Sequence, residues 1–204
     1  MARKRIAVLI SGRGSNMAAL IDAANDPAYP AEISLVLSNI PDAGGLGVAN
    51  SKGIKTEIVD HKKFGKDRAG FEQAIQGTLE ANKIQFVCLA GFMRLLTPAF
   101  VTHWHGRMLN IHPALLPSFK GLDTHERAIA EGVKIHGATV HFVVPEIDSG
   151  PIVAQAAVPV EEQDDVATLH ERIKVVERQM LVDSVGRLAR EGFTITDRKV
   201  RFGV

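Results

Sequence analysis

The sequence contains a single cysteine, Cys88, in a chain of 204 residues. One cysteine excludes a disulfide within the chain, which indicates a reducing compartment such as the cytoplasm. Cys88 also lies inside the apolar segment "FVCLAG", so we interpret it as a buried, inert thiol. The sequence therefore disfavours both a disulfide-stabilised secreted domain and a cysteine-dependent enzyme.

The chain also lacks long hydrophobic runs and a strong charge of either sign. No run of about 18 consecutive apolar residues occurs, so the sequence predicts no membrane-spanning helix. The N-terminal "MARKRIAVLIS" is basic and then apolar, but the apolar part is too short for a secretory signal and is typical of a first strand. The formal net charge is +1 without a polybasic run, which argues against nucleic acid as a partner.

Short apolar runs alternate with amphipathic stretches through the first half of the chain. The runs carry Val, Ile and Leu at consecutive positions, as strands buried on both faces of a parallel sheet do. Helical spacing of apolar residues occurs at 17–24 and again over 67–83. The strands predicted from these runs are residues 5–11, 32–39, 56–60 and 86–91.

The second half begins with a further predicted strand, 107–112. Two more apolar runs, 137–144 and 151–160, are joined by the polar "PEIDSG", which predicts an antiparallel hairpin. A long helix is expected from Asp165 to Arg190, and the last residues, "TITDRKVRFGV", predict a short hairpin.

These elements together predict one α/β domain over residues 1–204. We expect a Rossmann-like, mostly parallel twisted sheet with an antiparallel C-terminal hairpin and helices on both faces. No repeat, low-complexity tract or long linker divides the chain.

A glycine-rich loop follows the first predicted strand in "ISGRGSN". Gly12, Gly14, Ser15 and Asn16 place flexible backbone and exposed N–H groups at a helix N-terminus, which favours an anion. The third glycine of a dinucleotide fingerprint is replaced by Met17, and no Gly-Lys-Ser/Thr of a P-loop follows. The loop predicts a site for a single phosphate; the alternative is a tight turn capped by Ser15.

Asn110 and His112 lie two residues apart in "LNIHPALLPSFKG". Residues at this spacing in a strand point to the same side, and Pro113 biases His112 toward extended geometry. We therefore expect both side chains to face one cavity, although a buried strand end with a structural histidine would give the same pattern.

Asp148, in the "PEIDSGP" turn, is the acid that we expect to partner His112. His125, His136 and His141 lie near this region of the sequence. His136 and His141 are five residues apart, which places them on opposite faces of a strand, so at least one should be structural or exposed.

Metal binding and serine hydrolysis have little support. His103 and His105 form an H-x-H, but "TPAFVTHWHGR" looks helical, where side chains at this spacing do not converge. The sequence has no cysteine cluster, HExxH or G-x-S-x-G, so we expect no metal and no nucleophilic serine.

The segments "NIHPALLPSFKG", "AGFMRLLTPAF", "HGATVHFV" and "DSGPI" occur in this order. With them, the chain resembles the folate-dependent formyltransferases over essentially its whole length. The early "ISGRGSN" is similar to the members of that family that act on glycinamide ribonucleotide. Where the family pattern often has Pro-Gly, this chain has Lys120-Gly121, which puts the shape of that loop in doubt.

The resemblance implies a role for each matching position. The implied residues are Asn110, His112 and Asp148 for catalysis; Gly14, Ser15 and Asn16 for the substrate phosphate; Glu177 for the rest of the ribonucleotide; and Arg68, Met93, Arg94, Leu95, Leu96 and Asn110 for the folate. It also implies a phosphate- and ribonucleotide-binding half, 1–105, and a catalytic and folate-binding half, 106–204.

The activity implied is formyl transfer from 10-formyltetrahydrofolate, as co-substrate, to the amine of 5'-phosphoribosylglycinamide in purine biosynthesis. The amine would attack directly, through a tetrahedral intermediate and without a covalent enzyme intermediate. Asn110 and a protonated His112 would stabilise the oxyanion, and Asp148 would favour the imidazolium. Asp148 would also act in proton transfer from the amine to the leaving nitrogen, directly or through a water that it holds. We expect small-molecule substrates, no nucleic acid or membrane partner, a cytoplasmic location, and a monomer or homodimer.

Three other functions remain possible on the sequence alone. Methionyl-tRNA formyltransferase shares the trio but normally adds a basic RNA-binding domain, and formyltetrahydrofolate hydrolase usually adds an N-terminal regulatory domain. A phosphate- or nucleotide-binding module without enzymatic activity would keep the glycine-rich loop but would not need Asn110, His112 and Asp148 together.

Overall fold

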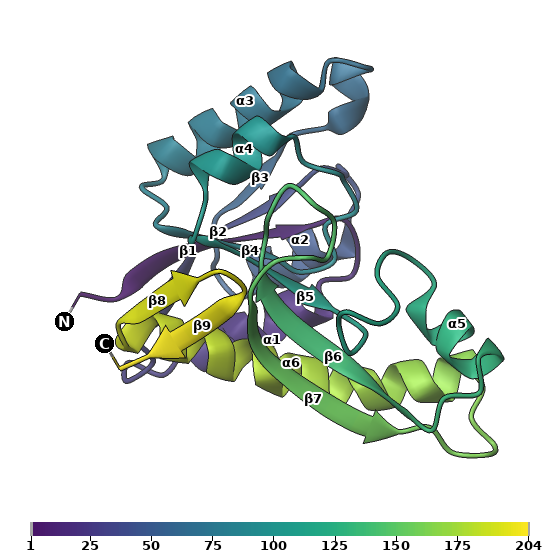
Figure 1. The fold of residues 1–204 in the computed structure, drawn as a ribbon. Coiled ribbons are helices and arrows are strands. Elements are labelled where there is room, and N and C mark those ends of the chain that lie inside the picture. The colour runs from purple at the N-terminus through teal and green to yellow at the C-terminus, as the bar shows by residue number, and fades with distance from the viewer. Residues whose placement is uncertain (1, 204) are drawn as a thin grey trace.

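A nine-stranded sheet runs through the centre of the computed structural model, which describes residues 2–203 (Figure 1). The strand order is β3-β2-β1-β4-β5-β6-β7-β9-β8. The strands are β1 (Lys4–Ile10), β2 (Ala31–Ser38), β3 (Thr56–Ile58), β4 (Phe86–Leu89), β5 (Met108–His112), β6 (Ile135–Phe142), β7 (Ile152–Pro159), β8 (Phe193–Thr196) and β9 (Lys199–Phe202).

The first five strands are parallel, and the next two turn the sheet antiparallel. β1 pairs in parallel with β2 and β4, and β4 pairs in parallel with β5. β6 is antiparallel to both β5 and β7, and β8 and β9 form the expected C-terminal hairpin. The predicted mixed sheet is therefore confirmed. The prediction that β3 is buried on both faces was wrong, because this three-residue edge strand is only half-buried.

Helices cover both faces of the sheet (Figure 1). They are α1 (Ser15–Ala24), α2 (Gly44–Ser51), the 3-10 helix η1 (His61–Phe64), α3 (Arg68–Ala81), α4 (Pro98–His103), α5 (Thr124–Ala130) and α6 (Val166–Arg190). Apolar side chains of α1, α2, α5 and α6 pack in one core cluster, and those of α3 and α4 pack in a second on the opposite face. The apolar side chains of each helix, which recur about every 3.6 residues, thus pack against a face of the sheet.

Helix α6 is the longest element, and its sequence sets both of its ends. Asp165 accepts a hydrogen bond from the Thr168 N–H at 2.8 Å, and the Thr168 side chain accepts one from the Asp165 N–H at 2.9 Å. This reciprocal capping box satisfies orphan donors of the first turn. The helix ends at Arg190, two residues before Gly192, close to the predicted boundaries.

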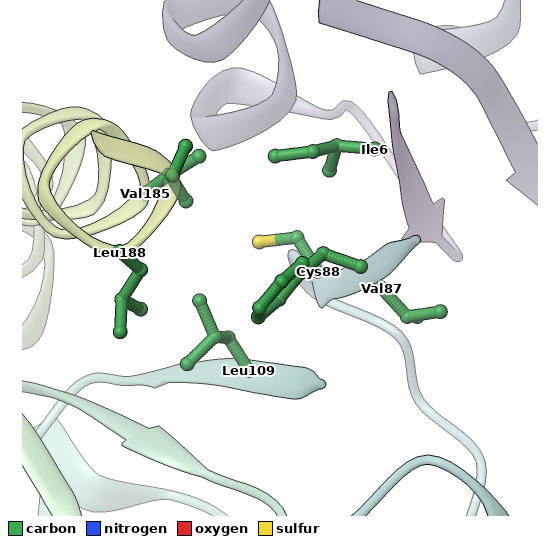
Figure 2. Close-up of a pocket in the computed structure, with 8 residues that line it drawn as sticks. Ile6, Val87, Cys88, Leu109, Val185 and Leu188 are labelled. Atoms are coloured by element: carbon green, nitrogen blue, oxygen red, sulfur yellow. The ribbon is translucent and has the colours of Figure 1, made fainter. Parts of the chain in front are cut away.

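A small apolar cavity lies between α6 and the sheet, within the core that they share (Figure 2). Its volume is about 10 Å³, and Ile6, Cys88, Leu109, Val185 and Leu188 are among the side chains that line it. A space of this size holds at most one water, and no polar side chain faces it apart from the thiol, so we expect it to be dry. Burial raises the pKa of Cys88 to about 12, which agrees with an inert thiol.

Membrane-crossing helices are absent from residues 2–203, because no helix there combines sufficient length with sufficient apolar character.

Candidate functional site

The candidate site lies where the sheet changes from parallel to antiparallel pairing, between β5 and β6. The carboxyl ends of β1, β4 and β5 meet at one edge of the sheet, which is where open α/β sheets generally place their ligand sites. The loops expected to bind phosphate and folate follow β1 and β4 at this edge, and His112 ends β5 there, whereas Asp148 comes from the turn between β6 and β7.

Strand β5 presents Asn110 and His112 on one side of the sheet. The antiparallel register pairs Asn110 with His141 and His112 with Thr139, so these four side chains share a face. His112 is 5% exposed, and Pro113 follows it as the strand ends. The predicted same-side arrangement of Asn110 and His112 is confirmed.

Asp148 approaches this face from the turn between β6 and β7. Its φ is 48°, a left-handed conformation that residues other than glycine rarely adopt. Its Oδ2 lies 3.5 Å from Nδ1 of His112, and its Oδ1 lies 3.7 Å from Nε2 of His141. The Gly121 N–H donates to Oδ2 at 2.8 Å. One nearly buried carboxylate therefore faces imidazoles from two strands.

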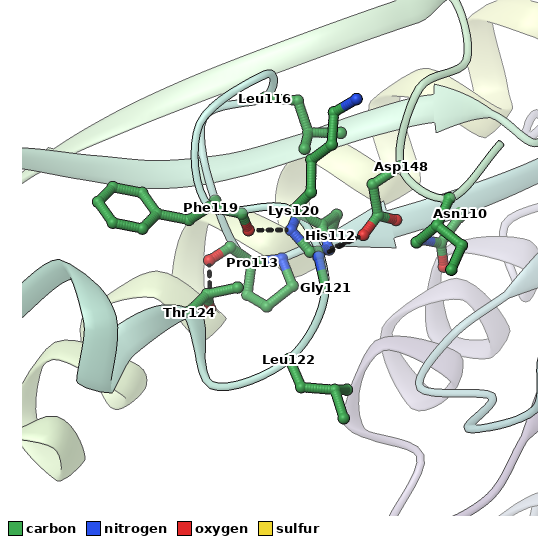
Figure 3. Close-up of polar contacts among 12 residues, drawn as sticks. Asn110, His112, Pro113, Leu116, Phe119, Lys120, Gly121, Leu122, Thr124 and Asp148 are labelled. Carbon is green, nitrogen blue, oxygen red and sulfur yellow. Dashed lines mark hydrogen bonds and ion pairs between the residues drawn. The ribbon is translucent and has the colours of Figure 1, made fainter.

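The ring of His112 lies between two acceptors (Figure 3). Nε2 is 2.9 Å from the carbonyl oxygen of Phe119, and Nδ1 faces the Asp148 carboxylate. Neither group can donate a hydrogen bond, so only the doubly protonated imidazolium supplies a hydrogen to each. His112 is thus held between two hydrogen-bond acceptors, one beside each ring nitrogen.

His141 is a site residue that the sequence did not single out. Its Nδ1–H donates to the carbonyl of Phe142 at 2.9 Å, which leaves Nε2 to accept from Nδ2 of Asn110 at 3.3 Å. Burial lowers the pKa of His141, which keeps the ring neutral and able to accept. The prediction that at least one of His136 and His141 is structural or exposed is confirmed by His136, which packs against His125, whereas His141 orients Asn110. The hairpin register, once known, would have indicated it.

His125 and His136 belong to a separate cluster on the other side of β6. Their ring centroids are 5.5 Å apart, and the ring of His170 on α6 lies 5.0 Å from His125. Burial lowers the pKa of His125 to about 4 and also lowers the pKa of His136. The predicted separation of His136 and His141 onto opposite faces is confirmed, and the cluster packs α5 against α6.

The glycine-rich loop leads directly into α1. Gly14 has a φ of 72° and precedes the first helical residue, Ser15, and no side chain caps the helix. Capping by Ser15, the alternative explanation of the loop, is therefore wrong. The N–H groups of the first turn lack a side-chain acceptor from residues 2–203, so they are available to an anion.

Glu177 on α6 lies beside the start of α1. It is 8% exposed, and burial raises its pKa to about 7, although the nearby Asn16 side chain and the charges of Arg178 and Lys174 oppose this rise. Oδ1 of Asn16 is buried without a hydrogen-bond partner in the described part of the chain. The structure thus brings Asn16 and Glu177 together, and Oδ1 of Asn16 remains free to accept a hydrogen bond.

The segment expected to line the folate site follows β4. Met93, Arg94 and Leu95 are exposed, whereas Leu96 packs partly against the core cluster of α3 and α4. The side chain of Arg68, at the first position of α3, donates to the carbonyl of Leu95 at 2.6 Å. Arg68 therefore lies beside the segment.

Ser11 joins the glycine-rich loop to this segment, which the sequence alone did not indicate. The Ser11 N–H donates to the carbonyl of Gly91 at 3.0 Å, and the Met93 N–H donates to the Ser11 hydroxyl at 2.7 Å. That hydroxyl in turn donates to Oδ1 of the buried Asn39 at 2.6 Å. These hydrogen bonds fix the position of the glycine-rich loop relative to the segment after β4.

The H-x-H pair does not form a site. α4 ends at His103, so His105 lies beyond the helix, and Nε2 of His103 is 2.9 Å from the amide of Gln76. Within residues 2–203, no group of three His, Cys, Asp or Glu side chains is arranged to hold a metal ion.

Comparison with known proteins places this site in a family. The family model described as formyl transferase matches residues 4–185. The chain is 51% identical to the trifunctional purine biosynthetic protein adenosine-3 of Homo sapiens over 87% of its own length, but it spans only 18% of that protein. It is 42% identical to phosphoribosylglycinamide formyltransferase of Haemophilus influenzae, with 87% of this chain and 83% of that protein covered.

A solved structure agrees with the sequence comparisons. Glycinamide ribonucleotide transformylase 1 from Symbiobacterium toebii superposes with a TM-score of 0.94 at 39% identity, covering 98% of this chain and 94% of that one. The family match extends from the first strand into α6 and includes every residue described above as part of the site. The chain belongs to the formyl transferase family.

Proposed function

We propose that the chain transfers the formyl group of 10-formyltetrahydrofolate to the amine of 5'-phosphoribosylglycinamide, a step of de novo purine (IMP) biosynthesis. The observation that carries the proposal is the convergence of Asn110, His112 and Asp148 at one edge of the sheet (Figure 3). It is supported by relatives whose names include this activity, among them the Haemophilus influenzae protein.

The ribonucleotide phosphate is assigned to the start of α1. Gly14, Ser15 and Asn16 offer uncapped N–H groups and small polar side chains, and the helix dipole favours negative charge there. Glu177 accepts hydrogen bonds from the remaining hydroxyl or amine groups of the same substrate. Lys174, one helical turn before Glu177, adds positive charge on this side.

The folate is assigned to the loop after β4. Met93 and Leu95 are 69% and 63% exposed, which is unusual for large apolar side chains and suits an aromatic ring system. Arg68 holds the Leu95 carbonyl and places a positive charge where an acidic substituent would leave the pocket. Arg94 and Leu96 complete the segment, and Asn110 lies within reach of both substrates.

The residues of the trio act on the transferred carbonyl. Asn110 and the imidazolium of His112 donate hydrogen bonds to the oxygen as negative charge develops on it, and a donor of this kind is worth about 3 kcal/mol. Asp148 keeps His112 charged and aimed, and it relays the proton released by the amine, directly or through a water, to the leaving N10 nitrogen of the folate, which restores the carboxylate. Direct transfer of the formyl group requires no covalent bond to the enzyme.

The wider setting follows from the same proposal. Both substrates are small molecules, and we propose a cytoplasmic enzyme, monomeric or homodimeric, with no nucleic-acid or membrane partner and no metal. The division at residue 105 separates the phosphate loop from the catalytic trio. The assigned folate residues Arg68 and 93–96 lie in the first half and Glu177 lies in the second, so each substrate would contact both halves.

An assay of formyl transfer tests the proposal. The release of 5,8-dideazafolate from 10-formyl-5,8-dideazafolate is followed by absorbance, with and without glycinamide ribonucleotide. We expect release only with the ribonucleotide, together with formation of the formylated ribonucleotide. Release without an acceptor would indicate a hydrolase, and no release under either condition would favour a binding module; either result would contradict the proposal.

A further inference from the structure

The loop after β5 makes three contacts with the catalytic region, two of which are described above with the candidate site. The Phe119 carbonyl contacts His112, and the Gly121 N–H donates to Asp148. Between these residues, the ammonium group of Lys120 lies 2.6 Å from the hydroxyl oxygen of Ser149. Figure 3 shows the Lys120 side chain near Asp148.

The contact between Lys120 and Ser149 has a defined direction. Ser149 is 5% exposed, and its hydroxyl donates to the carbonyl of Ile147 at 2.9 Å. The oxygen lone pairs are therefore free to accept from the ammonium group of Lys120. Charge-assisted hydrogen bonds of this kind are stronger than neutral ones. A lysine on an exposed loop is thus engaged with a buried group of the neighbouring turn.

The turn that carries Asp148 needs support from its surroundings. Asp148 adopts a left-handed conformation, which costs free energy and persists only where neighbouring contacts enforce it. One such constraint follows at Gly150, where a Cβ atom would lie 1.7 Å from the carbonyl oxygen of Phe142. The bond from Lys120 to Ser149 constrains the turn at the residue directly after Asp148.

We propose that Lys120 is a positioning residue for the transfer reaction. By tying the 145–149 turn to the 118–121 loop, it holds Asp148 and His112 at a fixed separation, since the same loop contacts both side chains. The backbone of this loop is itself anchored, because the Arg127 side chain donates to the Lys120 carbonyl at 2.7 Å. The inference rests on the proposed formyl transfer, whose geometry it refines.

The acidic neighbour of Lys120 contributes little to this role. The ammonium group also lies 3.7 Å from Glu146, but the Glu146 side chain is 78% exposed. Ion pairs at exposed positions are screened by solvent and are weak. The hydrogen bond to Ser149 is therefore the contact that matters, and the charge pair with Glu146 is dispensable.

Steady-state kinetics of four variants test the proposal in the intact chain. Lys120→Met keeps the aliphatic stem but removes the donor, Ser149→Ala removes the acceptor, and Lys120→Arg restores a donor. Lys134→Met is the matched control, because Lys134 is exposed and its side chain forms no hydrogen bond or ion pair within residues 2–203. The kcat, the KM for each substrate and the Tm are measured for every variant and for the double variant of Lys120 and Ser149.

A positioning role predicts a specific pattern. We expect Lys120→Met and Ser149→Ala each to lower kcat by about tenfold, because misplacement of a catalytic group by less than 1 Å costs rate rather than binding. The KM for the ribonucleotide and the Tm should change little. The double variant should be no worse than either single variant, and Lys120→Arg should recover part of the loss.

Other patterns overturn the proposal. A kcat within twofold of wild type in Lys120→Met and Ser149→Ala would show that the hydrogen bond between these two residues is not needed for catalysis. A raised KM with unchanged kcat would show that Lys120 binds substrate, and equal losses in Lys134→Met would show a general charge effect. An inactive wild-type chain would instead contradict the proposed function itself, so the two failures are distinguishable.

Discussion

At the scale of single residues, the environment of each imidazole determines what it can do. His112 lies between a carbonyl and a carboxylate, which both accept hydrogen bonds. His141 has one donor position satisfied by a carbonyl and presents its free nitrogen to the Asn110 amide. His125 and His136 face each other in a buried cluster, where charge is disfavoured. Of these four side chains, only His112 has an acceptor group beside each ring nitrogen.

The first prediction concerns His112 and Asp148. His112→Ala removes an oxyanion donor, and Asp148→Asn removes the charge that stabilises the imidazolium, so each should lower kcat by roughly 100- to 1000-fold. Binding of the folate analogue, measured by fluorescence titration, should remain close to wild type. Turnover near the wild-type rate in either variant would exclude the assigned role.

The second prediction uses the raised pKa of Glu177, about 7 in the folded chain against an ordinary 4.5. Because the folded pKa is raised, the stability contributed by the protonated form is fully present below pH 4.5 and is lost as the pH rises through 7. The wild-type chain should therefore lose about 3 kcal/mol of this contribution across that window. Glu177→Gln stays neutral and should not lose it.

Urea denaturation of wild type and Glu177→Gln at pH values from about 5 to about 8, which bracket the raised pKa, measures this difference. We expect the free energies of unfolding to converge at low pH and the variant to be more stable at high pH. Glu131→Gln, at an exposed position after α5, is the control for loss of one carboxylate. Parallel curves for wild type and Glu177→Gln would rule out the burial effect.

The sequence predicts those residue contacts that depend on local geometry. Asn110 and His112 share a face because strand side chains alternate, and Pro113 keeps the chain extended. The role of His141 could not be found in this way, since its partners come from β5 and from a turn in left-handed conformation. Ser15 was a plausible cap by residue type, but the backbone at Gly14 starts the helix without one.

At the scale of elements, the β6–β7 hairpin shows how tightly the site is packed. The third prediction is that Gly150→Ala displaces the turn, because the new Cβ would lie 1.7 Å from the Phe142 carbonyl oxygen. The cost should reach the upper end of the roughly 1–3 kcal/mol typical of overpacking, and kcat should fall together with stability. Thermal unfolding and the transfer assay measure the two effects.

A second glycine provides the control for that experiment. Gly77 lies within α3, and a Cβ there would meet no atom within 4 Å. Gly77→Ala should therefore stabilise the chain by about 0.5–1 kcal/mol, through the higher helix propensity of alanine, and leave kcat unchanged. A stabilised Gly150→Ala variant would show that the hairpin yields more easily than its packing indicates.

Elements with strong local signals were predicted well, and weakly marked ones were missed. α6 has a capping box and a continuous apolar stripe, so both of its ends agree with the sequence. α2 was not predicted, because "GGLGVANS" has three glycines and its stability comes from packing on the core. α5 is short and begins after Asp123 in left-handed conformation without a side-chain cap.

At the scale of the molecule, one core connects the two halves of the chain. The boundary at residue 105 falls between β4 and β5, which are hydrogen-bonded neighbours in the same sheet. α6 packs against α1 from the first half and against β6 and β7 from the second. The larger core cluster accordingly includes Ile6 and Leu20 together with Val140 and Leu181. This arrangement predicts that the halves unfold together.

The only tryptophan of the sequence makes that cooperativity measurable. Trp104 is 2% exposed and lies in the core cluster of α3 and α4, on the opposite side of the sheet from α6. Leu188 lines the small cavity under α6 and is 4% exposed (Figure 2). A substitution at Leu188 therefore perturbs one face of the sheet while the tryptophan reports on the other.

The last prediction is that Leu188→Ala lowers the free energy of unfolding by about 2–5 kcal/mol, because it enlarges an existing dry cavity that the surroundings can only partly fill. The urea midpoint from Trp104 fluorescence should shift by the same amount as the midpoint from far-UV circular dichroism, as expected for two-state unfolding. If the fluorescence transition stayed at its wild-type midpoint while the dichroism shifted, the two sides of the sheet would be separate cooperative units. Coincident shifts would mean that the phosphate loop and the catalytic trio depend on one folding equilibrium, so destabilising α6 would reduce the fraction of active enzyme without touching either site.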